Sequence, residues 1–76
     1  SSSVKLKFVS DEKLGQGSTK YFTDSASINI GVYPLSTSLF ERYIPIKDSD
    51  FVKMGVTFFH EMTHYQNHVS ENTNRK

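Results

Sequence analysis

The strongest constraint on the fold is the segment of residues 54–67, in which Glu61 is the only charged residue. The segment contains no Pro, and its apolar residues recur at helical spacing, so it predicts a helix. His60 and His64 are four residues apart and therefore share one face of that helix, with Glu61 at its flank. The sequence thus brings two imidazoles and one carboxylate together on a helix.

These residue types at this spacing suit a zinc ion. Neutral imidazoles bind Zn²⁺ at about 2.0–2.1 Å, and a catalytic zinc takes three protein ligands and leaves one position for a water whose pKa falls to about 7. Glu61 adjoins a ligand without being one, so it can act as general base toward that water and pass the proton to a leaving amine. We expect His60 and His64 as metal ligands and Glu61 as the catalytic residue. The alternative is that His60 and His64 are surface histidines that neither bind a metal nor take part in catalysis.

The motif His-Glu-x-x-His, with Thr57 and Phe58 before it and Tyr65 after it, resembles that of the zincin metallopeptidases. Its form in residues 60–64 is similar to that of the deuterolysin-like peptidases (aspzincins) and of bacterial effector zinc peptidases. The resemblance ends there, because aspzincins continue with Gly-Thr-x-Asp and residues 65–70 do not. It implies Zn²⁺ as cofactor, a peptide or protein as substrate, and a secreted or effector-like setting.

The third zinc ligand is not placed by the motif. Metzincins have a Gly and a third His at the positions of Asn67 and Ser70, and gluzincins use a Glu on a later helix, for which no room follows Glu71. His68 continues the four-residue spacing, but on an unbroken helix its Cα lies about 12 Å from that of His60. We therefore expect His68 to be dispensable for metal binding.

Four acidic residues before the helix are the remaining ligand candidates: Asp24, Glu41, Asp48 and Asp50. The last two lie at the helix start, and from Asp50 to His60 the helix rises about 15 Å, too far to share an ion. A loop can fold back over the site, so Asp24 and Glu41 stay open. Because only two ligands are placed, we expect the chain alone to be a poor peptidase that needs the remainder of its domain or a second chain.

Length and composition limit the rest of the fold. A chain of 76 residues forms one small domain, and it has no Cys for a disulfide. Its net charge of +1 does not favour nucleic acid or an anionic membrane, and no apolar run reaches the roughly 18 residues that span a bilayer. We expect no nucleic acid and no membrane partner. We interpret residues 1–76 as a single zincin-like domain or the N-terminal fragment of one, with residues 1–3 as a disordered lead-in.

Alternating patterns before the helix predict short strands. Residues 4–8 alternate apolar and basic side chains, so a strand there would bury Val4, Leu6 and Phe8. Residues 21–23 and 27–33 predict two further strands joined by a tight turn.

The segments between these strands are expected to be turns and loops. Residues 10–13 are turn-like, and residues 14–19 form a polar loop. Pro34 ends the last strand. In zincins the strand before the active-site helix offers its backbone edge to an extended substrate, and by order residues 28–33 are the candidate.

The long helix is expected over residues 49–70, with residues 48–50 supplying its N-cap and an acidic first turn. One side carries apolar residues and is expected to face the sheet, while His60 falls nearly opposite and faces a cleft. The apolar side consists of Phe51, Gly55, Phe58, Phe59, Met62, Tyr65 and Val69. Gly55 is expected to permit close approach of a strand. Residues 35–47 are a connector with room for a short helical turn at residues 38–43.

The sequence therefore predicts an α+β domain in which a small antiparallel sheet of three to four short strands packs on one long C-terminal active-site helix. The predicted function is zinc-dependent peptide-bond hydrolysis. Two alternatives stay open: a non-catalytic metal-binding or effector fragment, and an interaction module whose aromatic face contacts a partner. Metal content measured together with turnover distinguishes the peptidase from the non-catalytic metal-binding fragment. A folded, metal-free chain bound to a partner would favour the interaction module.

Overall fold

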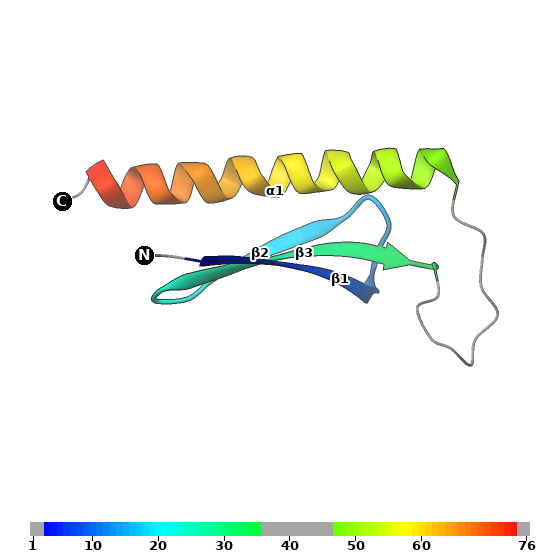
Figure 1. Ribbon diagram of the computed structural model, residues 1–76, viewed down its shortest axis with the longest axis horizontal. Helices are drawn as coiled ribbons and strands as arrows, with labels where there is room; N and C mark the ends of the chain where they lie inside the picture. Colours follow the sequence, from blue (N-terminus) through cyan, green and yellow to red (C-terminus); the bar gives the residue numbers. More distant parts are fainter. Residues whose placement is uncertain (1–2, 36–46, 75–76) are drawn as a thin grey trace.

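The structure is a computed structural model that describes residues 3–35 and 47–74. Three strands, β1 (Ser3–Lys13), β2 (Gly17–Tyr21) and β3 (Ser25–Tyr33), precede one helix, α1 (Asp48–Asn74). The strands form one sheet, and α1 lies lengthwise over one of its faces (Figure 1). This arrangement confirms the α+β class and the long C-terminal helix. The helical turn expected at residues 38–43 lies outside the described residues.

The sheet is mixed, not antiparallel as predicted. Its strand order is β1-β3-β2, with β2 antiparallel to β3 and β1 parallel to β3. Residues 10–13, predicted as a turn, extend β1 past the point where its register with β3 shifts. There the chain passes closely by Gly31, where a Cβ would collide with the carbonyl oxygen of Lys13. Gly31 therefore allows β3 to lie between two strands that are joined by a short turn.

The first strand begins earlier than expected. Ser3, assigned to a disordered lead-in, belongs to β1, and its backbone N–H donates a 3.2 Å hydrogen bond to the carbonyl of Asp24. The strand at residues 4–8 is confirmed, but its apolar side chains are exposed rather than buried. The reason is the position of the helix, which packs mainly against β2 and β3.

The core is built on β3, the central strand. Its apolar residues Ala26, Ile28, Ile30 and Val32 are buried, as is Leu35 just after it. Ile28, Ile30 and Val32 share one face, as predicted. The strand also ends before Pro34, as predicted. Both edges of β3 are paired, so it cannot offer an edge to a substrate, and that prediction is wrong. In the described part of the chain, the strand with an open edge beside the helix is β2.

The helix α1 has 27 residues and is about 40 Å long. Its predicted acidic first turn is present in Asp48 and Asp50. The N-cap position is Lys47, one residue earlier than predicted. The carboxylate of Asp50 accepts a 2.9 Å hydrogen bond from the Lys47 backbone N–H, the reach-back half of a capping box. Within residues 3–35 and 47–74, no helix combines the length and apolar composition needed to cross a membrane.

The face of α1 that meets the sheet differs from the predicted one by about a quarter turn. Most of the predicted core side is exposed, namely Phe51, Gly55, Phe58, Phe59 and Val69, while Met62 and Tyr65 are partly buried. Over residues 48–72, the part of the helix whose burial is described, Thr57 and Glu61 are the buried residues. They fit because Gly17 of β2 has no side chain: a Cβ there would lie 2.6 Å from Cγ2 of Thr57 and 2.8 Å from the carbonyl oxygen of Asn29.

Two glycine replacements should therefore have opposite effects on stability. Gly17→Ala should lower the free energy of unfolding by about 1–3 kcal/mol, because the helix or the sheet must move to admit the methyl group. Gly55→Ala is the matched control. Its Cβ would meet nothing within 4 Å, so it should raise the free energy of unfolding by about 0.5–1 kcal/mol through helix propensity. Urea unfolding of both variants measures this, and equal effects would contradict the close packing at Gly17.

Candidate metal site

His60 and His64 lie one turn apart on the exposed flank of α1. Their Nε2 atoms are 3.1 Å apart, and the rings meet edge to face with centroids 4.6 Å apart. Two nitrogen ligands at 2.0–2.1 Å from one tetrahedral ion are about 3.3 Å apart. The pair therefore has the spacing that a shared ion requires. Without an ion, the same distance suits a hydrogen bond in which one neutral imidazole donates to the other.

Glu61 completes the group from the buried side of the helix. Its side chain is 7% exposed, and its Oε1 accepts a 2.6 Å hydrogen bond from the Thr19 hydroxyl on β2. The ligand atoms of His60, Glu61 and His64 all lie within 4.8 Å of one another. The structure thus brings the three predicted site residues together in a group that can hold a metal ion.

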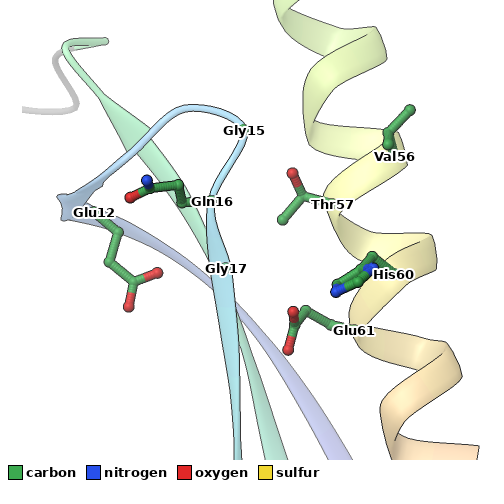
Figure 2. Close-up of a pocket in the computed structure, with 8 residues that line it drawn as sticks. All are labelled: Glu12, Gly15, Gln16, Gly17, Val56, Thr57, His60 and Glu61. Atoms are coloured by element: carbon green, nitrogen blue, oxygen red, sulfur yellow. The ribbon is translucent and has the colours of Figure 1, made fainter.

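The group lies between two pockets along the seam of β2 and α1. One pocket has a volume of about 640 Å³ and is lined by Glu12, Gly15, Gln16, Gly17, Val56, Thr57, His60 and Glu61 (Figure 2). In this view Thr57 and Glu61 point from α1 toward β2, whereas Glu12 lies beyond β2. The second pocket, of about 450 Å³, is lined by Thr19, Tyr21, Glu61, His64, Asn67, His68 and Glu71. The seam is therefore hollow on both sides of the candidate metal group.

The other ligand candidates do not join this group in the described residues. Those outside it are Asp24, Asp48, Asp50, His68 and Glu71. The His68 ring stacks on Tyr21 with centroids 3.8 Å apart, and its Nε2 lies 3.0 Å from Nδ2 of Asn72. Glu41 lies outside the described residues. The third ligand therefore stays unassigned.

Tyr21 and Thr19 are site residues that the sequence reasoning missed. Alternation along β2 places Gly17, Thr19 and Tyr21 on the face toward α1, but residues 14–19 were interpreted as a loop. Burial, then the negative charge of Glu61, then Tyr65 raise the pKa of the Tyr21 phenol above its usual value. Tyr21 therefore stays protonated at neutral pH and can donate a hydrogen bond.

Comparison with known proteins adds no relative. The chain matches no protein-family model, no curated protein and no solved structure. What supports a function is therefore the residues and geometry of the site itself.

Replacing Thr19 with Val should destabilise the protein through Glu61. The isosteric change removes the donor to a buried carboxylate and should cost about 1.5–3 kcal/mol of unfolding free energy. In a Glu61→Gln background the lost hydrogen bond is between neutral groups, so the cost should fall to about 1 kcal/mol. Urea unfolding of the four proteins of this double-mutant cycle tests the contact. Additive effects would mean that the two side chains do not interact.

Proposed function

We propose that the protein is a zinc-dependent peptidase of the zincin type, with His60 and His64 as zinc ligands and Glu61 as general base. The observation that supports this most strongly is the 3.1 Å separation of the two Nε2 atoms beside a buried carboxylate. Imidazole nitrogens with an adjacent carboxylate form a donor set that suits zinc. A structural pair of surface histidines would not require the carboxylate to be buried next to them.

The residues divide the chemistry between them. Zinc, when bound, supplies Lewis-acid polarisation of the scissile carbonyl. Glu61 takes a proton from the attacking water and returns it to the leaving amine. The hydrogen bond from Thr19 occupies one oxygen of Glu61 and holds the carboxylate in place, so the proton transfer needs no rearrangement of this side chain.

The open edge of β2 supports a peptide as substrate. An extended peptide can add to a sheet edge as a further strand, with main-chain hydrogen bonds giving affinity. In the described residues β2 is an edge strand, and its Thr19 contacts Glu61 directly. A peptide paired along β2 would therefore pass next to the general base.

The third protein ligand is the part of this proposal that the described residues do not supply. Among residues 3–35 and 47–74, the metal-binding group contains His60, Glu61 and His64 alone. With Glu61 as base, we propose that a carboxylate or imidazole from outside the described residues completes the site. Slow turnover by the 76-residue chain would agree with this division.

The function is tested by peptide cleavage with zinc-loaded protein and a mixed peptide pool analysed by mass spectrometry. We expect cleavage that stops when a chelator removes the metal and returns when zinc is restored. Cleavage that persists in chelator would contradict the proposal. Zinc bound through both histidines without cleavage of any peptide would favour the non-catalytic metal-binding alternative.

A further inference from the structure

The pocket on the C-terminal side of the metal group has one ordered aromatic wall. The Tyr21 ring stacks on His68 with an interplanar angle of 23°, and the amide of Asn72 contacts the far nitrogen of His68. The stack spans β2 and α1, so both elements hold the ring in place. We call this space of about 450 Å³ the Tyr21 pocket.

The charges around the Tyr21 pocket are of one sign. Its lining contains the carboxylates of Glu61 and Glu71 and no Lys or Arg. Glu71 is exposed, and the described part of the chain gives it no ion pair. An acidic ligand side chain would therefore be repelled there, whereas a cation would gain a partner in Glu71, and its stem could contact the part of the Tyr21 ring that the stack with His68 leaves exposed.

The position of Glu71 along the helix would place it beside a substrate residue close to the cleaved bond. It follows His64 by seven residues, about 10 Å along the helix axis. An extended peptide rises about 3.3 Å per residue, so the peptide residue level with Glu71 is two or three positions from the bond at the metal. The screening length at physiological salt is about 8 Å, so a cation paired with Glu71 is repelled only in part by a metal ion held at His64.

We propose that the Tyr21 pocket binds a lysine or arginine side chain of the substrate, two or three residues from the scissile bond. This inference rests on the proposed peptidase function and names its substrate class. The cation pairs with Glu71, and its aliphatic stem lies along the Tyr21 ring. The neighbouring pocket also has carboxylates, Glu12 and Glu61, but no Tyr or Phe lines it, so a lysine or arginine stem would find no aromatic ring of that kind there.

The test uses fluorescein-labelled peptides that are identical except for Arg, Gln or Glu placed two or three residues from the cleaved bond. Binding to zinc-loaded protein is measured by anisotropy, and cleavage by kcat/KM. The wild type should prefer Arg over Gln by about fivefold. Glu71→Gln should reduce this preference below about twofold, and Glu71→Lys should reverse it in favour of the Glu peptide. Asp11→Asn, the same loss of charge on β1, is the matched control and should keep the wild-type preference.

The outcomes separate this inference from the function on which it rests. Peptides that bind without an Arg preference, a preference that survives in Glu71→Gln, or no peptide binding at all would each overturn the Tyr21 pocket proposal. A zinc titration run on the same samples reports the metal site independently. Zinc bound with no charge preference would leave the peptidase proposal standing, whereas absence of zinc binding would remove both.

Discussion

Replacing Glu61 with Gln should leave zinc bound and lower peptide turnover by about 10²–10⁴-fold, the usual contribution of a general base. The amide has the shape of the carboxylate and can still accept the hydrogen bond from Thr19, so the helix should stay against β2. It cannot take a proton from water at neutral pH. The measurement is kcat with zinc-loaded protein, together with zinc content and urea unfolding of the same samples.

A matched control distinguishes the base from a general effect of removing a buried charge. Glu12→Gln makes the same change at a carboxylate that lines the adjacent pocket from beyond β2, and it should keep turnover within about threefold of wild type. Loss of zinc in Glu61→Gln would instead make Glu61 a metal ligand. Unchanged turnover in Glu61→Gln would exclude it as the base.

The site could be predicted from sequence because it depends on local spacing. His60 and His64 share a helix face wherever that helix packs, and Glu61 follows from the same geometry. The helical spacing of the apolar residues around them, with no Pro in the segment, predicts the helix itself, which the structure confirms at slightly greater length. The buried face of β3 could also be predicted from a local pattern, because Ile28 and Ile30 alternate with other residues in a strand that ends before a Pro.

The rest of the fold depends on contacts between distant segments, and local patterns misjudged it. Apolar residues in α1 and β1 predicted burial that the structure does not show, because the helix meets the sheet through Thr57 and Glu61. Gly17 determines which face of α1 contacts the sheet, because only a residue without a side chain leaves room for Thr57 there. Gly17 lies on another element and was interpreted as part of a loop. Gly55, by contrast, was expected to allow close approach and faces open space.

The strand order also depends on contacts between segments that are distant in the chain. A parallel β1 beside β3 requires the chain to pass by Gly31, and nothing in the pattern of residues 10–13 distinguishes that path from a turn. Thr19 was missed as a partner of Glu61 for a related reason, because the two lie far apart in the chain and meet only after β2 packs under α1. The candidate site was therefore predictable in its helical part and not in its sheet part.

The most direct measurement of the central claim is a zinc titration of the wild type, His60→Ala, His64→Ala and His68→Ala, with affinity read by competition against a chelating dye. The proposed site predicts one zinc per wild-type chain and a loss of affinity well above 100-fold in each of the first two variants, since second-shell changes alone cost about 10–100-fold. His68→Ala, the matched control on the next turn, should change affinity by less than about threefold. Equal stoichiometry and affinity in the wild type and His64→Ala would contradict the assignment of the metal site.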